Sequence, residues 1–110
     1  MRNNKQIVAP PRSAIRYAAS IRRVLGEHIR EIRLFGSQAR GDASSASDYD
    51  FLIVLDRKDR ATRDKIRDVG VQMMNECDQL FAALVYQENE WDIIRNTPLG
   101  WNIQEEGVAL

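Results

Sequence analysis

The stretch GSQARGDASSASDYDFLIVLD, residues 36–56, contains the features on which the fold depends. Its second half, Tyr49–Leu55, is rich in aromatic and β-branched residues and is followed by Asp56, which predicts a strand. Its first half comes directly after another short strand candidate, residues 32–35, and consists of glycine and small polar residues. Such residues predict a loop with a turn of helix at its start. The chain therefore passes from one strand to the next through a polar segment.

Two acidic residues, Asp48 and Asp50, stand at the start of the predicted strand. Because side chains alternate along a strand, both carboxylates should project from one face. Paired carboxylates suit Mg²⁺, and two such ions can clamp the attacking and leaving oxygens of a phosphoryl transfer. Gly36 and Ser37 offer a sharp turn, free backbone N–H groups and a hydroxyl, which together can cradle a phosphate. Taken singly, each of these pieces is also typical of a solvated turn without a ligand.

Helix and strand patterns continue on both sides of this stretch. Apolar residues recur at helical spacing before and after it, and a short apolar run predicts a further buried strand. Together these patterns predict an α+β domain over residues 12–110, in which helices flank a small mixed β-sheet. Residues 1–11 are polar, end in Pro10-Pro11 and predict a flexible N-terminal arm. Outside the quoted stretch and residues 32–35, the predicted elements are helices at 13–29, 61–79, 88–95 and 98–106 and strands at 80–86 and 108–110.

Length and composition exclude several classes of protein. A chain of 110 residues forms one domain. Its 16 Lys and Arg residues balance 16 Asp and Glu residues, which excludes a strongly basic module for long nucleic acids. No apolar run approaches the ~20 residues that span a membrane, and no secretory signal is visible, so we expect no membrane partner. The single Cys77 cannot form an internal disulfide, so we expect a cytoplasmic protein.

The Gly-Ser pair at residues 36–37 and the Asp-Tyr-Asp at residues 48–50 together resemble the signature of the DNA polymerase β-like nucleotidyltransferase superfamily. The Ala-Arg-Gly extension at 39–41, Ser47 and the short chain are similar to the minimal nucleotidyltransferases in particular. The resemblance covers the layout of the whole chain, including a last helix that ends in Glu-Gly-Val-x-Leu at residues 106–110. It implies the polymerase β-like nucleotidyltransferase fold.

The resemblance assigns a role to each residue of the motif. Gly36 and Ser37 would hold the β- and γ-phosphates of ATP, and Arg40 would help to offset phosphate charge. Asp48 and Asp50 would bind Mg²⁺, with two ions expected. The reaction would be attack by a hydroxyl group on the α-phosphate, with pyrophosphate leaving. Catalysis would depend mainly on positioning and charge neutralisation.

The same resemblance suggests a partner. Many of these small proteins are antitoxins encoded beside a helical toxin of the HEPN family, and some inactivate the toxin by transferring AMP from ATP to one of its tyrosines. A HEPN-type toxin is therefore the expected protein partner. Two alternatives stay open: the same fold acting as an antitoxin or adaptor by binding alone, and a transferase acting on a small hydroxylated molecule such as an antibiotic.

A third carboxylate is the element of the pattern that this sequence does not obviously supply. The family usually carries it on the next strand, where it completes the metal site and can accept the proton of the attacking hydroxyl. Here that strand, predicted at residues 80–86, contains no acidic residue. Asp78, just before it, is the candidate for this catalytic role, with Glu76 a weaker one. Otherwise Asp78 caps the end of the helix or faces water.

The balanced net charge is unevenly distributed along the chain. Residues 1–40 carry nine cations and two anions, an excess of seven positive charges, and residues 41–110 carry the opposite excess. Such polarity can mark a binding surface, or it can reflect helix faces with different solvated charges. We hypothesise that arginines of the basic half face the triphosphate or an acidic partner. The arginines concerned are Arg16, Arg22, Arg23 and Arg30.

Overall fold

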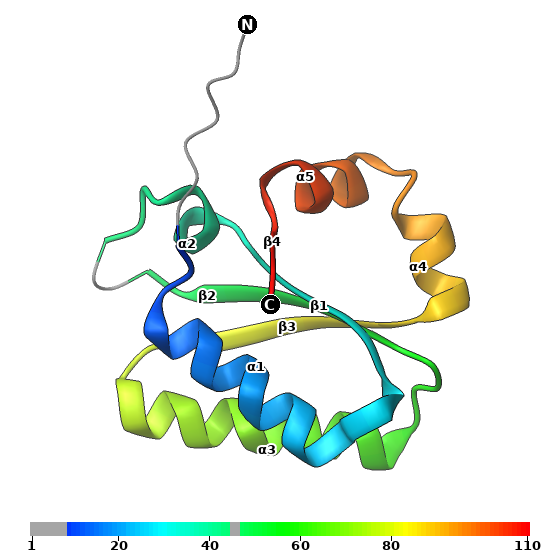
Figure 1. Cartoon of the computed structure of the whole chain (residues 1–110), viewed down its shortest axis with the longest axis horizontal. Helices are drawn as coiled ribbons and strands as arrows, with labels where there is room; N and C mark the ends of the chain where they lie inside the picture. The colour runs from blue at the N-terminus through cyan, green and yellow to red at the C-terminus, as the bar shows by residue number, and fades with distance from the viewer. Residues whose placement is uncertain (1–8, 45–46) are drawn as a thin grey trace, which may run out of the picture.

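The computed structural model describes residues 9–44 and 47–110 (Figure 1). Most of the predicted N-terminal arm thus lies outside the described residues, and the first helix begins directly after Pro11. The predicted α+β class is confirmed, because helices flank a four-stranded sheet. The elements in chain order are α1 (Arg12–Leu25), η1 (Gly26–His28), β1 (Ile29–Phe35), α2 (Ser37–Arg40), β2 (Tyr49–Leu55), α3 (Arg60–Cys77), β3 (Phe81–Gln87), α4 (Glu88–Ile94), α5 (Pro98–Glu106) and β4 (Val108–Ala109).

The sheet is mixed, with the strand order β3-β2-β1-β4. β2 is antiparallel to β1 and parallel to β3, and the short β4 is antiparallel to β1. The register places Asp50 between Phe35 of β1 and Ala82 of β3. Because β2 lies inside the sheet, its first residues have neighbours on both sides.

The first helix is shorter than its apolar pattern predicts. Its buried residues recur at helical spacing, but Gly26 adopts a positive φ of 55° and ends the helix. Ile29, predicted as the last apolar position of this helix, instead begins β1 and pairs with Leu55 of β2. The helical spacing of Ile29 was coincidental, and the glycine was the local signal for the end of the helix.

One face of the sheet is closed by α1 and α3. Tyr17 of α1 lies against Phe51 of β2 and Phe81 of β3, with ring centroids 4.1 and 5.7 Å apart. Phe51 is fully buried, and Tyr17 is 1% exposed. Burial of one such side chain contributes about 1.5–3 kcal/mol relative to exposure, so this aromatic stack is a main source of stability.

The opposite face is covered only in part, by α4 and α5. Leu52 and Val54 of β2 pack there against Trp91 and Ile103, all nearly inaccessible to solvent. α5 approaches the end of α4 closely at Gly100, where a Cβ atom would lie 2.1 Å from the carbonyl oxygen of Ile94. Of the two tryptophans, Trp91 is buried in this cluster, whereas Trp101 is 58% exposed. No helix in the described part of the chain is both long and apolar enough to cross a membrane.

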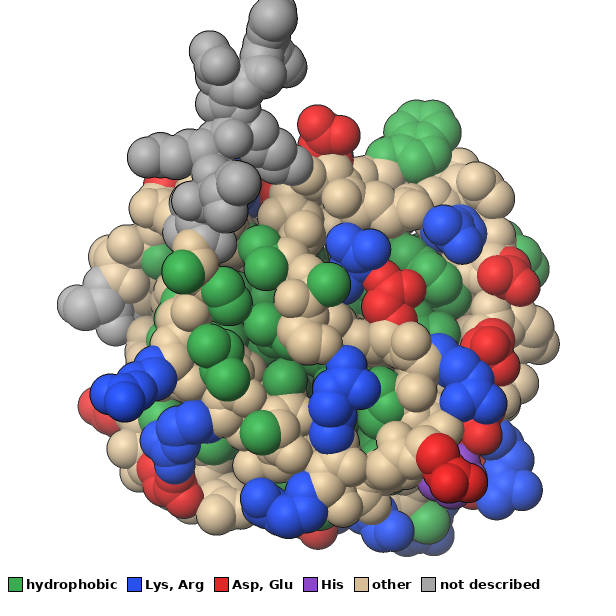
Figure 2. Space-filling view, in the orientation of Figure 1, with side chains coloured by type: hydrophobic (Ala, Val, Ile, Leu, Met, Phe, Trp, Pro, Cys, Tyr) green, Lys and Arg blue, Asp and Glu red, His purple; other side chains and the backbone are tan. Residues whose placement is uncertain are grey.

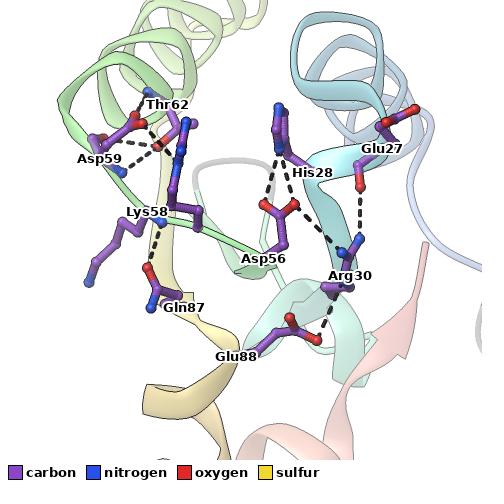
Figure 3. A network of polar contacts seen from close by, with 10 residues as sticks. Glu27, His28, Arg30, Asp56, Lys58, Asp59, Thr62, Gln87 and Glu88 are labelled. Atoms are coloured by element: carbon purple, nitrogen blue, oxygen red, sulfur yellow. Dashed lines mark hydrogen bonds and ion pairs between the residues drawn. The ribbon is translucent and has the colours of Figure 1, made fainter.

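A polar network fixes the end of the sheet that lies farthest from the Gly36 turn (Figure 3). Asp56, directly after β2, accepts from His28 at 3.1 Å and pairs with Arg30 at 3.5 Å. Arg30 also pairs with Glu88 of α4 at 3.5 Å. The network joins the ends of β2 and η1 to the start of α4, so that only the other end of β2 is left open.

Candidate functional site

The turn between β1 and α2 is built around Gly36. Its φ of 78° lies in the region that favours glycine, and a Cβ atom there would lie 2.6 Å from Oδ2 of Asp50. The carbonyl oxygen of Gly36 accepts the N–H groups of Ala39 and Arg40 at 3.1 and 3.0 Å, which closes the turn of α2. The predicted sharp turn is present. The group that approaches Gly36 in this structure is the carboxylate of Asp50.

Ser37 begins α2 and stands next to this turn. Within the described part of the chain, its N–H and that of Gln38 have no backbone acceptor. The first N–H groups of a helix have no partner inside the helix and can bind an anion instead. The turn therefore offers donors beside a carboxylate, an arrangement that suits a phosphate–metal complex better than a phosphate alone.

Asp48 and Asp50 lie at the open end of β2, as the sequence predicts. Asp50 is half-buried and shares a face with Leu52 by strand alternation, whereas Asp48 is exposed just before the strand. Neither forms an ion pair with a described residue. Burial raises the pKa of Asp50, and the negative charges of Asp48 and Glu106 raise it further. A divalent cation would relieve this crowding of charge, so the donor set fits Mg²⁺.

Glu106 is a site residue that lies outside the predicted set. Its Oε1 accepts the N–H of Gly36 at 2.9 Å, and its carboxylate pairs with Arg40 at 3.2 Å. Arg40 also pairs with Asp42 at 3.2 Å, and the hydrogen bonds that the guanidinium donates to Asp42 and Glu106 raise its pKa. Glu106 therefore connects the last turn of α5 to the Gly36 turn. The one sequence signal was its place in the Glu-Gly-Val-x-Leu ending.

The hollow beside Asp50 completes the site. It has a volume of about 200 Å³ and is lined by Phe35, Asp50, Ala82 and Leu84 among others. Phe35 and Ala82 are also the register neighbours of Asp50 on the two flanking strands. The carboxylate thus lies beside an apolar recess that is open to solvent, where a reacting group could approach it.

Asp78 does not join the two carboxylates in this conformation. It is the C-cap of α3, is exposed, and donates its N–H to the carbonyl oxygen of Met74 at 2.8 Å. In residues 9–44 and 47–110, no three Asp, Glu, His or Cys side chains gather closely enough to hold a metal ion. The physical reason is that β3 begins only at Phe81, which leaves Asp78 in the turn. The residue beside Asp50 on β3 is Ala82.

Most of the arginines named in the basic half form contacts outside the Gly36 turn. Arg16 contacts Glu76 of α3 at 2.5 Å, Arg22 donates to the carbonyl oxygen of Leu110 at 2.7 Å, and Arg30 belongs to the Asp56 network. Figure 2 shows Lys and Arg side chains spread over the lower part of the visible face, over α1 and α3. These partners lie outside the Gly36 turn, so the structure gives no support to the hypothesis that Arg16, Arg22 and Arg30 face a triphosphate. For Arg23, and for an acidic partner, the hypothesis stays a prediction.

Comparison with known proteins agrees with this geometry. The sequence matches the family model of the nucleotidyltransferase domain over residues 15–103, and no curated protein matches it significantly. The fold is similar to a toxin–antitoxin crystal structure with AMP-PNP (TM-score 0.56, 18% identity, covering 86% of this chain and 69% of that chain). It is also similar to tri-AMPylated Shewanella oneidensis HEPN toxin in complex with MNT antitoxin (TM-score 0.51, 15% identity, covering 88% and 67%). These similarities confirm the predicted fold.

Proposed function

The chain belongs to the family of nucleotidyltransferase domains, and from this premise we propose that it transfers AMP from ATP to a hydroxyl group of a partner protein with the help of Mg²⁺. The observation that carries the proposal is the Gly36 turn, placed directly against the carboxylate of Asp50. The N–H groups of Ser37 and Gln38 in this turn have no backbone acceptor among the described residues. The similar structures named above, one with AMP-PNP and one with an AMPylated HEPN toxin, support a tyrosine of a HEPN-type toxin as the acceptor. This chain would then be the antitoxin of a cytoplasmic pair.

Each described residue of the site has a place in this reaction. The N–H groups of Ser37 and Gln38 would bind the β- and γ-phosphates, and Arg40 would offset part of their charge. Asp48 and Asp50 would hold Mg²⁺, which neutralises phosphate charge when bound. Glu106 would keep the turn and Arg40 in place through its two contacts.

The transfer itself requires few covalent events. The hydroxyl oxygen of the acceptor forms a bond to the α-phosphorus, the bond to pyrophosphate breaks, and the hydroxyl proton is lost. Glu106 is near enough to raise the pKa of Asp50, but its carboxylate already accepts the N–H of Gly36 and pairs with Arg40. No group of three such side chains that could hold a metal ion forms among the described residues. A general base typically contributes 10²–10⁴-fold to a rate, so we expect slow transfer, with the proton passing to solvent or to the partner.

A second candidate function is binding without catalysis. Two observations favour it. Ala82, which has no carboxylate, occupies the position beside Asp50, and the carboxylate of Glu106 already accepts the N–H of Gly36. In this case the chain would neutralise its partner by contact alone.

Incubation with labelled ATP, Mg²⁺ and the partner encoded by a neighbouring gene distinguishes the two functions. We expect transfer of label to the partner, with loss of transfer in Asp48→Ala and Asp50→Ala. Asp42→Ala is a matched control, because Asp42 is an exposed carboxylate that contacts Arg40 at the same turn. Neutralisation of the partner that survives both substitutions, without any label transfer, would refute catalysis in favour of binding.

A further inference from the structure

A groove of about 480 Å³ runs between α3 and the edge strand β3, on the face of the sheet opposite Asp50. Three apolar side chains along it are exposed to solvent: Val71 by 46%, Met74 by 39% and Leu80 by 48%. α3 lies close to β3 here, because a Cβ atom at Gly70 would be 3.3 Å from the carbonyl oxygen of Phe81. A contiguous apolar surface of this kind marks an interaction site more often than a free surface.

The strand that borders the groove is an uncharged sheet edge, shielded only by the side chain of Lys58 at the carbonyl oxygen of Val85. β3 is the outermost strand, and its seven residues, FAALVYQ, carry no charge. Its carbonyl groups alternate in direction: that of Leu80 accepts from Tyr49 of β2 at 2.9 Å, whereas that of Val85 is contacted from outside by Lys58 Nζ at 3.4 Å. Proteins usually shield such an edge with charges, prolines or short length, as the two-residue β4 does at the other edge. Pairing of β3 with another strand would therefore require Lys58 to release the carbonyl oxygen of Val85.

The groove has charges of opposite sign at its two ends. At one end its charged side chains are Lys58, Arg63 and Arg67. Lys58 and Arg67 already pair with acidic residues of this chain, whereas Arg63 forms no ion pair with any described residue. At the other end stands Asp78, which is exposed and also has no ion-pair partner in the described ranges. α3 and β3 run in opposite directions, because the N–H of Lys58, before α3, donates at 2.9 Å to Gln87 at the far end of β3. The groove is thus self-complementary under a two-fold rotation.

We propose that a second copy of this chain covers the groove, with the two β3 strands paired antiparallel around a two-fold axis at Leu84. The two sheets then form one continuous sheet, with Phe81 opposite Gln87 and Ala83 opposite Val85. Arg63 of each copy lies toward Asp78 of the other, and the exposed apolar side chains of the two grooves face each other. The interface lies on the face away from Asp48 and Asp50, so it is independent of the proposed function.

Sedimentation velocity over a range of protein concentrations tests the interface directly. We expect a dimer that dissociates on dilution, and a monomer for Met74→Glu, which places a charge in the apolar part of the groove. Trp101→Glu is the matched control, because Trp101 is also an exposed apolar residue but lies on α5, and this variant should remain dimeric. A wild-type chain that is monomeric at every concentration would overturn the proposal, as would a dimer that persists in Met74→Glu.

Exchange of charges tests the two-fold arrangement. Arg63→Glu and Asp78→Lys should each raise the dimer dissociation constant about tenfold, because each creates two like-charged pairs across the axis. An equimolar mixture of the two variants should dimerise again, since both cross-axis pairs in the mixed dimer are then of opposite sign. Circular dichroism melting confirms that each variant is folded. Folded variants that dimerise no better in the mixture than alone would contradict this geometry.

Discussion

The two faces of the sheet differ in the surroundings that they give to the side chains of β2. On one face, Phe51 stacks between α1 and β3 and is shielded from water. On the other, α4 and α5 cover Leu52 and Val54 but leave the neighbouring Asp50 in an open hollow. Because side chains alternate along a strand, the packing and the charged group are one residue apart in sequence and lie on opposite sides of the sheet. Stability and chemistry should therefore respond separately to substitutions in β2.

Asp50→Asn should have the largest effect on activity. On the proposed function, loss of the carboxylate that faces the Gly36 turn removes a ligand for Mg²⁺, and we expect AMP transfer to fall by about 10³-fold. The melting temperature should stay the same or rise, since the raised pKa of Asp50 reflects burial and repulsion by Asp48 and Glu106. Labelled-ATP assays and thermal melting measure the two effects. A large loss of stability in this variant would contradict the separation of the two faces.

Phe51→Ala, one residue away, should lower the stability of the fold and leave AMP transfer nearly unchanged. Truncation of this fully buried ring should lower the free energy of unfolding by about 3–5 kcal/mol. Transfer per folded molecule should change little at a temperature well below melting. Urea unfolding gives the stability, and Phe51→Leu is a conservative control that should cost less than about 1.5 kcal/mol. If Phe51→Ala stays folded yet loses transfer as fully as Asp50→Asn, the faces are coupled.

Ala82→Asp tests the open face by adding a carboxylate to it. Ala82 is the register neighbour of Asp50 on β3, so an aspartate there would bring a third carboxylate to the pair. We expect the transfer rate to increase by about 10–100-fold as this group accepts the hydroxyl proton. Ala83→Asp, which places the same side chain on the closed face, should destabilise the fold without increasing the rate. An unchanged rate in a folded Ala82→Asp would indicate that the lack of a third acid does not limit transfer.

Glu106→Ala tests how the open face is held in place. Without this carboxylate, the N–H of Gly36 and the guanidinium of Arg40 lose a common partner. We expect the KM for ATP to increase about five- to tenfold, with a smaller change in kcat. Adding Arg40→Ala to this variant should then have little further effect, because coupled residues are not additive. Full additivity of the two substitutions would show that Glu106 does not act through Arg40.

Thr97→Ala should have the smallest effect. Thr97 caps α5 by accepting the N–H of Gly100 at 3.3 Å, and removal of such a cap costs about 1 kcal/mol. Thr97→Ser keeps the hydroxyl and should retain most of this stability in urea unfolding. The KM for ATP should be unchanged at temperatures where the variant is folded. An increased KM would mean that the start of α5 influences Glu106 at its other end.

Much of the fold is predictable because local and tertiary preferences agree. β2 occupies the predicted residues 49–55, and α5 begins at Pro98 and ends before Gly107, as its cap and breaker predict. The error at Ile29 arose where periodicity continued past Gly26, a residue whose backbone conformation ended the helix. Local signals therefore placed the elements well and their ends less well.

The candidate site was predictable only for residues that lie close together in sequence. Gly36, Ser37, Asp48 and Asp50 form one motif, and the structure brings them together as expected. Glu106 comes from 70 residues beyond Gly36, so no local spacing reveals its contact. The role predicted for Asp78 depended on where β3 begins, and Asp78 lies four positions before Ala82, the residue that pairs with Asp50, so it stays in the turn.

The contact between Glu106 and Gly36 also has a consequence for biosynthesis. The ribosome makes the Gly36 turn first and adds Glu106 only 70 residues later, on the order of ten seconds at typical elongation rates. β4, which pairs with β1 and anchors the chain after Glu106, follows later still. A nascent chain thus carries the Gly36 turn before the carboxylate that holds it in place. The contact between Glu106 and Gly36 can form only after α5 has been made, so on the proposed function nucleotide binding follows the synthesis of most of the domain.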